Sequence, residues 1–158
     1  MEHLGIILPA TTENSKMATQ KKAQPVIYSS TYTTTAPPES FSDSAHGDVT
    51  WHTLFSQPDT PTSSLVAGIA SCPARTGHLC AHRHEQAEIY HIIDGVGEVT
   101  IDGDVTRLEK GATMYIPSNA EHGIVNTGSG ELRWLYVFAT SAFTDVVYRF
   151  TGIEKAKL

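Results

Sequence analysis

Only two cysteines, Cys72 and Cys80, occur among the 158 residues of the chain, which is too few for a disulfide framework. The N-terminal segment is also poor in hydrophobic sequence, because its apolar run at residues 5–8 is too short for a secretory signal. Both shortages favour a protein of a reducing compartment. We therefore expect an intracellular, cytoplasmic location.

Positive charge and long apolar runs are scarce as well. The 11 lysines and arginines are outnumbered by 17 carboxylates, which gives a formal net charge of −6. No basic run offers an electrostatic footprint for nucleic acid or for an anionic membrane. No apolar stretch approaches the roughly 20 residues of a membrane span. These absences argue against nucleic acid and membranes as partners.

The composition fits one domain preceded by a polar arm. A hydrophobic share of 40% is enough for one core of ordinary size, and no internal repeat is apparent. Residues 1–47 are polar and rich in turn formers, which is typical of an arm, so we place the domain at residues 48–158. Met17 is an alternative to Met1 as the natural start. Residues 26–28 are a β-prone patch able to pair with a sheet edge, including that of a partner subunit.

From residue 49 onward, short β-prone runs alternate with turn signals, which is typical of a closed antiparallel barrel or a jelly roll. The clearest hairpin turns are residues 101–104 and 126–130. Apolar side chains have helical spacing over residues 143–150, so we expect a short C-terminal helix or a closing strand there. The nine expected strands are residues 49–55, 64–71, 76–84, 88–93, 97–102, 105–108, 113–116, 123–126 and 132–138.

A histidine pair and a glutamate predict a metal site. Successive side chains of a strand point to opposite faces, so His82 and His84 share a face and are able to hold one ion. On a continuous strand Glu88 would lie roughly 13 Å beyond His84, which is too far for metal–ligand bonds of about 2 Å. The chain must therefore turn back at residues 85–87, which places residues 88–93 on a strand beside the histidines.

A third imidazole comes from a separate part of the sequence. His122, Ile124 and Asn126 alternate as strand residues do, and strands of a barrel direct alternate side chains toward a common axis. We therefore predict one metal site made by His82, His84, Glu88 and His122. The alternative is a barrel with a vestigial site.

The two segments resemble the two sequence motifs of the cupin superfamily. The matching positions are Gly77, His82, His84, Glu88 and Gly95 in the first motif, and Gly111, Pro117, His122 and Asn126 in the second. The resemblance covers about half of the chain and implies an all-β, single-domain, jelly-roll-like cupin β-barrel that forms a homodimer.

Two positions depart from the usual cupin pattern. Gly77 lies one residue nearer to the first histidine, and Asn119 stands where glycine is common. Asparagine tolerates the left-handed backbone conformation better than most residues do, so we expect the turn at Asn119 to be preserved.

Three imidazoles and one carboxylate leave one or two open positions on an octahedral ion. This donor set suits Fe(II), Mn(II), Ni(II) or Co(II), and Zn(II) fits with fewer ligands engaged. An open position gives a small-molecule substrate access to the divalent transition metal. Anchoring a carboxylate or an enolate oxygen there stabilises negative charge on it.

Tyr90 is the candidate catalytic residue. It has the strand parity of Glu88, so its hydroxyl is expected inside, near the metal, as a general base for removing a proton next to a carbonyl group. A core aromatic whose hydroxyl reaches a buried partner is the alternative.

Aromatic side chains are expected to form the wall of the pocket. Trp134, Tyr136 and Phe138 alternate with Arg133, Leu135 and Val137, so the aromatic set faces inward, although core packing alone would explain it. The expected pocket residues are Met114, Trp134, Tyr136 and Phe138. Cys80 has the strand parity of His82. We expect it to be a small buried hydrophobic side chain, and the alternative is that its thiol lines the interior.

The chain is similar to small single-domain metal-dependent cupins, including those that cleave dimethylsulfoniopropionate by β-elimination. That group has a tyrosine two residues after the metal-binding glutamate, which Tyr90 matches. Its second functional tyrosine corresponds to either Tyr136 or Tyr148. Three functions stay open: a lyase or isomerase that abstracts a proton, an Fe(II)-dependent dioxygenase, and a non-catalytic small-molecule binder.

Overall fold

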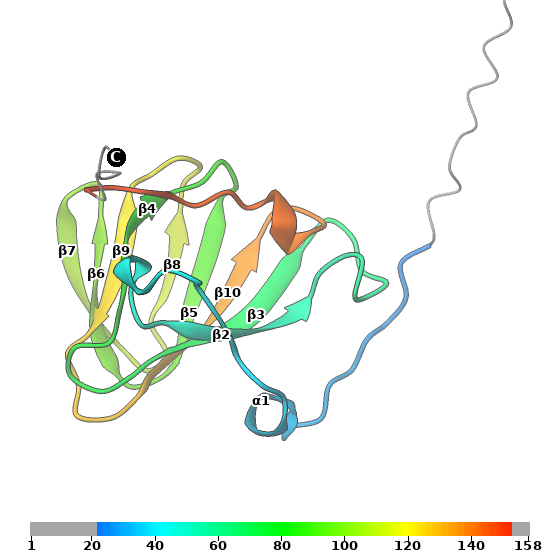
Figure 1. The fold of residues 1–158 in the computed structure, drawn as a ribbon, viewed down its shortest axis with the longest axis horizontal. Helices are drawn as coiled ribbons and strands as arrows, with labels where there is room; N and C mark the ends of the chain where they lie inside the picture. Colours follow the sequence, from blue (N-terminus) through cyan, green and yellow to red (C-terminus); the bar gives the residue numbers. More distant parts are fainter. Residues whose placement is uncertain (1–21, 153–158) are drawn as a thin grey trace, which may run out of the picture.

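A computed structural model describes residues 22–152 of the protein, as two antiparallel sheets that face each other (Figure 1). The arm residues before position 22, Met17 among them, lie outside the described part of the chain. The six-stranded sheet has the order β1 (Glu39–Ser40), β2 (Thr50–Phe55), β3 (Val66–Cys72), β10 (Leu132–Phe138), β5 (Glu88–Asp94) and β8 (Thr113–Ile116). The five-stranded sheet has the order β11 (Arg149–Phe150), β4 (His78–Arg83), β9 (His122–Asn126), β6 (Val96–Ile101) and β7 (Asp104–Glu109).

The all-β, jelly-roll-like class expected from the sequence is confirmed. Each of the nine expected strands is present, and β8 and β10 have the expected bounds. The hairpin between β6 and β7 turns at Asp102 and Gly103, both of which have positive φ angles, 48° and 93°. This conformation matches the right-handed twist of the flanking strands. Asn119 has a φ of 62°, so the turn there is left-handed as expected.

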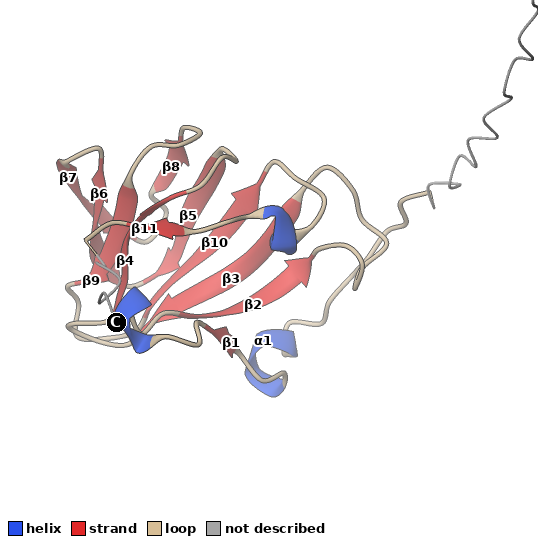
Figure 2. Ribbon diagram, turned by 45° about the horizontal axis from the view of Figure 1, so that its top comes forward, coloured by secondary structure: helices blue, strands red, loops and turns tan. Residues whose placement is uncertain are grey.

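The position expected for the Glu88 strand is wrong in one respect. Residues 85–87 do not fold β5 back beside β4; they carry the chain from the five-stranded sheet into the other one (Figure 2). β5 pairs with β10 and β8, whereas β4 pairs with β9 and β11. Glu88 therefore reaches the histidines across the interior between two sheets, a route that alternation along a single strand does not reveal.

A register shift in β4 changes which side chains face inward. The pairing of β4 with β9 shifts between Leu79 and His82, and both of these residues are buried although they lie three positions apart. Cys80, which has the parity of His82, is only half-buried, and its thiol donates to the carbonyl oxygen of Ala45 at 3.3 Å. Cys80 is thus neither an interior residue nor a small core side chain, because the shift breaks the simple period of two.

The core lies between the sheets and is built by alternation. Leu132, Trp134, Tyr136 and Phe138 are buried along β10, while the residues between them are partly exposed. The inward direction expected for this aromatic set is therefore correct. Two of these side chains contact residues expected at the site: the Trp134 ring packs against Tyr90 and the Phe138 ring against His84.

Described segments on either side of the barrel strands pack onto this framework. Before the barrel, the short helix α1 (Tyr32–Thr35) places the Tyr32 ring 4.2 Å from that of Tyr28. β1 pairs with β2, so part of the expected arm is joined to the sheet; the boundary at residue 47 stays a prediction. After the barrel, a 3-10 helix (Phe143–Asp145) leads into β11, so both C-terminal alternatives occur. Within residues 22–152, no helix has the length and apolarity needed to cross a bilayer.

Asn126, on β9, holds three backbone carbonyl groups together, one at the end of β3 and two in loops. Its fully buried side-chain amide donates to the carbonyl oxygens of Cys72, Pro73 and Gly130 at 2.8–3.1 Å, and its own oxygen accepts from the Gly128 amide.

We expect Asn126→Asp to lower the free energy of unfolding by at least about 3 kcal/mol, because each buried group left without its partner costs about 1–3 kcal/mol. Thr127→Asp adds the same charge at the neighbouring exposed position and should change stability by no more than about 0.5 kcal/mol. Urea denaturation measures both. Equal stability of the two variants would refute this role of Asn126.

Candidate metal centre and cavity

Three histidine rings from two strands meet between the sheets. His82 lies on β4, His84 follows the end of that strand, and His122 begins β9. Each is no more than 1% exposed. One ring nitrogen from each of the three lies within 4.8 Å of the others, which is close enough for all three to bind one ion.

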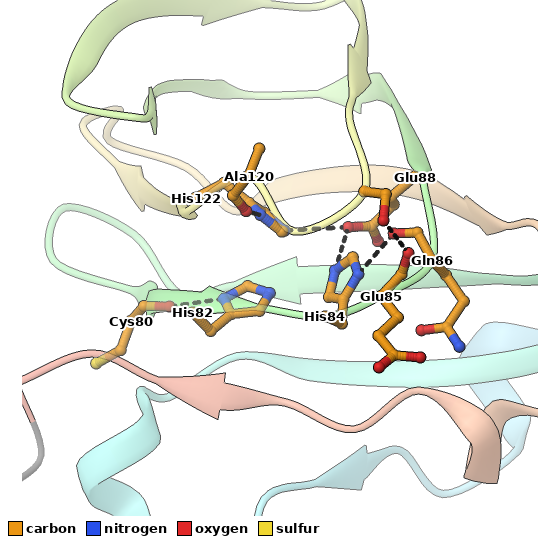
Figure 3. A network of polar contacts seen from close by, with 9 residues as sticks. Cys80, His82, His84, Glu85, Gln86, Glu88, Ala120 and His122 are labelled. Atoms are coloured by element: carbon orange, nitrogen blue, oxygen red, sulfur yellow. Dashed lines mark hydrogen bonds and ion pairs between the residues drawn. The ribbon is translucent and has the colours of Figure 1, made fainter.

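The far side of each ring is held by a backbone carbonyl (Figure 3). The Nδ1 atoms of His82 and His84 lie 2.8 Å from the carbonyl oxygens of Cys80 and Gln86, and that of His122 lies 3.0 Å from the carbonyl oxygen of Ala120. A carbonyl accepts only, so each Nδ1 carries the proton. In a neutral imidazole the lone pair is then on Nε2, the tautomer that metal-binding histidines use.

Two of these lone pairs receive no hydrogen bond from the described residues. The buried Nε2 atoms of His82 and His84 make no hydrogen bond with any described residue. Leaving a buried polar atom unsatisfied costs about 1–3 kcal/mol, so such an arrangement calls for a ligand. Burial, then the neighbouring His122, lowers the pKa of His82 well below 6.5, which keeps its ring neutral and able to bind a cation. The donor set therefore fits a divalent transition metal.

Glu88 adjoins this cluster from the opposite sheet. Its Oε2 lies 3.2 Å from Nε2 of His122 and 3.3 Å from Nε2 of His84, and its side chain is 2% exposed. Figure 3 shows the carboxylate beside these two rings, with His82 farther away. A buried carboxylate facing unprotonated nitrogens is stabilised by a shared cation, so a metal at this point would also satisfy Glu88.

A small cavity of about 20 Å³ adjoins Glu88 in the interior of the barrel. Of the residues expected to line a pocket, Trp134 and Tyr136 line it, as does Tyr90. Phe138 instead packs its ring edge-on to His84, 5.1 Å away. Met114 pairs with Tyr90 across β5 and β8 but does not line the cavity.

Tyr90 lies deep in this cavity. It is 2% exposed, and its ring centroid is 6.2 Å from that of His122 and 5.6 Å from that of Trp134. Burial first, then the carboxylate of Glu88, raises the pKa of Tyr90 well above 10. Without a bound cation it is therefore a neutral phenol at physiological pH.

Tyr148 also faces the site. It precedes β11 in an irregular segment, lines the cavity, and lies with its ring 4.7 Å from that of His82. Burial is the main cause that raises the pKa of Tyr148 well above 10. The sequence left Tyr148 and Tyr136 as alternatives for a second tyrosine, and the structure brings both to the cavity.

Sequence reasoning missed several cavity residues outside the motifs. Phe41, Trp51 and Phe143 line the cavity from the segment before β2, from β2 and from the 3-10 helix. Phe41 belongs to an irregular segment, so no periodic pattern marks it. The helical spacing at residues 143–150 predicted an element at Phe143 but not that its ring lines the cavity. Trp51 lies on an expected strand, and alternation of side chains along that strand could have shown that Trp51 faces inward.

Comparisons with known protein families and with individual proteins agree on the family of this chain. The profile described as "Cupin domain" matches residues 72–138. The dimethylsulfoniopropionate lyase DddW of Ruegeria pomeroyi is 40% identical over 111 residues, which cover 70% of this chain and 71% of that protein. The protein MJ1618 of Methanocaldococcus jannaschii is 40% identical over 73 residues, 46% of this chain and 56% of its own length.

Solved structures share the fold at lower identity. The polyketide cyclase RemF from Streptomyces resistomycificus superimposes with a TM-score of 0.64 at 18% identity, over 77% of this chain and 84% of that one. A structure described under DMSP lyases RdDddP and RnDddQII gives a TM-score of 0.60 at 20% identity, over 72% of this chain and 61% of that one. At these identities the likeness concerns the fold alone.

Proposed function

This chain belongs to the cupin superfamily, and from that premise we propose that it is a metal-dependent lyase that removes a proton beside the carboxylate or carbonyl group of a small organic substrate. One observation carries the proposal: the buried side chain of Tyr90 lines the same interior cavity as Glu88, and Glu88 adjoins two of the three converging imidazoles. The 40% identity to a dimethylsulfoniopropionate lyase supports the elimination reaction over isomerisation.

The metal would be held by Nε2 of His82, His84 and His122, with Glu88 as the fourth ligand. When bound, a divalent cation supplies a Lewis acid that binds a substrate oxygen, stabilises negative charge on it and lowers the pKa of a nearby phenol. The carbonyl groups behind the three rings fix their orientation before binding, which reduces the reorganisation that ligation would otherwise require.

Tyr90 would be the general base. As a phenolate it takes a proton from the carbon next to the carboxylate; the electrons of that C–H bond form the carbon–carbon double bond, and the leaving group departs from the next carbon with its bonding pair. The aromatic walls formed by Trp134, Tyr136 and Tyr148 exclude bulk water, which strengthens the electrostatic interactions inside the cavity.

The test is turnover with and without oxygen. Protein loaded in turn with Fe(II), Mn(II), Co(II), Ni(II) or Zn(II) is incubated with dimethylsulfoniopropionate, other β-substituted carboxylates and β-dicarbonyl compounds, in air and under nitrogen. We expect release of the leaving group, measured by gas chromatography, at equal rates in both atmospheres. Oxygen consumption with loss of activity under nitrogen would identify a dioxygenase instead, and ligand recovered unchanged would identify a binding protein. The homodimer stays a prediction for sedimentation to test.

A further inference from the structure

Tyr136 lines the cavity, but its hydroxyl contacts a threonine of β2 rather than one of the histidines. Its side chain is 4% exposed and lines the cavity, yet its Oη lies 3.3 Å from Oγ1 of Thr53, on β2. β2 and β10 are separated by β3 (Figure 2). The tyrosine therefore spans the width of a strand to reach its partner.

Gly68, on β3, makes this crossing possible. In the register of the sheet, Gly68 pairs with Thr53 on one side and with Tyr136 on the other, and Tyr136 in turn pairs with Tyr90. A Cβ atom at position 68 would lie 2.2 Å from Oη of Tyr136, a distance that non-bonded atoms do not adopt. The absence of a side chain at this one position lets the phenol lie across the strand.

The Thr53 hydroxyl continues the contact to a carboxylate. Oγ1 of Thr53 lies 3.1 Å from Oε2 of Glu39, on β1. Glu39 is fixed by two further donors: the Thr53 amide at 2.8 Å from Oε1 and the Trp51 indole Nε1 at 3.0 Å from Oε2. An ionised carboxylate only accepts hydrogen bonds, so Thr53 donates to Glu39. The Thr53 oxygen then accepts from Tyr136, and no other described residue donates a hydrogen bond to the Tyr136 oxygen.

The two ends of this chain lie in different environments. Tyr136 and the buried Tyr90 line the interior cavity, whereas Thr53 and Glu39 line a second, outer hollow beside Tyr28 and Tyr32. Glu39 itself is exposed. Three hydrogen-bonding side chains thus connect the interior cavity to a carboxylate in contact with solvent.

We propose that Tyr136, Thr53 and Glu39 form a proton relay between the cavity and the outer hollow. The inference rests on the proposed lyase function, which leaves one substrate proton in the interior cavity at each turnover. Tyr90 takes that proton from the substrate and gives it up across the cavity to the Tyr136 oxygen. The O–H proton of Tyr136 passes to Thr53, and the Thr53 proton passes to the Glu39 carboxylate, which releases it to water. One proton enters, one leaves and no electron pair is transferred.

The kinetic test compares Thr53→Val with Thr53→Ser. Valine keeps the shape of the side chain but removes the hydroxyl, and we expect kcat to fall about tenfold with KM unchanged, less than the 10²–10⁴-fold contributed by a residue that transfers a proton directly. The solvent deuterium isotope effect on kcat should increase as proton release becomes limiting. Serine keeps the hydroxyl and should restore most of kcat. Glu39→Gln, which removes the terminal acceptor, should reproduce the valine result.

A matched control is Thr144→Val, because Thr144 lines the same outer hollow without belonging to the relay, and kcat should not change. If Thr53→Val and Glu39→Gln fold normally and keep the wild-type kcat and isotope effect, the relay is refuted. A fall in kcat that serine does not restore would also refute it, because the loss would then come from packing.

A second measurement does not depend on activity. In metal-free protein with ¹³Cζ-labelled tyrosine, hydroxyl exchange at Tyr136 is followed by its deuterium isotope shift. We expect Thr53→Val to slow this exchange and Thr53→Ser to restore it. Unchanged exchange would overturn the relay even if the lyase is real; altered exchange in a protein that turns over no substrate would leave the relay standing and refute the lyase.

Discussion

Replacing Tyr90 with phenylalanine is expected to lower kcat by about 10²–10⁴-fold, the range for removal of a general base, while metal content stays at the wild-type level. Phenylalanine keeps the ring against Trp134 and His122, so the cavity wall is preserved and only the hydroxyl is lost. Steady-state kinetics together with elemental analysis of the same sample measure the two quantities. A loss in kcat without a loss of metal separates a role in proton transfer from a role in building the metal centre.

Tyr115→Phe is the matched control for this substitution. Tyr115 lies on β8 next to Met114 and is 64% exposed. The Tyr115→Phe substitution therefore removes the same hydroxyl oxygen outside the cavity, and the variant should keep full activity. If Tyr90→Phe retained wild-type kcat with metal bound, Tyr90 would be a core aromatic and the base would have to be sought among the other cavity residues. Tyr148 would then be the next candidate, because its ring lies beside His82.

The strands and the histidine cluster could be predicted because each depends on local alternation. Along β10 every second residue is buried, and a period of two is readable from four or five residues. The same period places His122 and Asn126 on the inward face of β9. Where the chain keeps a regular strand, the sequence therefore contains enough information to orient a side chain.

The remaining features depend on relations between strands, which a sequence does not display. Glu88 meets His84 and His122 across two sheets, and the shift in β4 turns Cys80 outward. Tyr148 reaches the cavity from an irregular segment. The contact of Tyr136 with Thr53 requires both residues to pair with Gly68, and a glycine in a strand does not by itself indicate what approaches it.

Substituting His122 with alanine is expected to weaken divalent-metal affinity by more than about 100-fold, since loss of even an outer hydrogen-bond partner of a ligand costs 10–100-fold. His122 is the ring whose Nε2 adjoins Glu88 at 3.2 Å, so its loss also removes a neighbour of the carboxylate. Activity should disappear together with the metal. Calorimetric titration of metal-free protein with Mn(II) or Co(II) measures the affinity directly.

Thermal stability gives an independent measure of the same loss. A ligand that binds only the folded state at 100 times its Kd stabilises that state by about 2.7 kcal/mol, so added metal should raise the Tm of the wild type and of His91→Ala but not that of His122→Ala. His91 is exposed on β5, and its Nδ1 lies 2.7 Å from the Thr113 hydroxyl. The His91→Ala substitution therefore removes an imidazole that does not belong to the cluster. Equal metal-induced shifts in all three proteins would mean that the ion binds elsewhere. The converging nitrogens of His82, His84 and His122 would then require another ligand, and the proposed elimination would lose its Lewis acid.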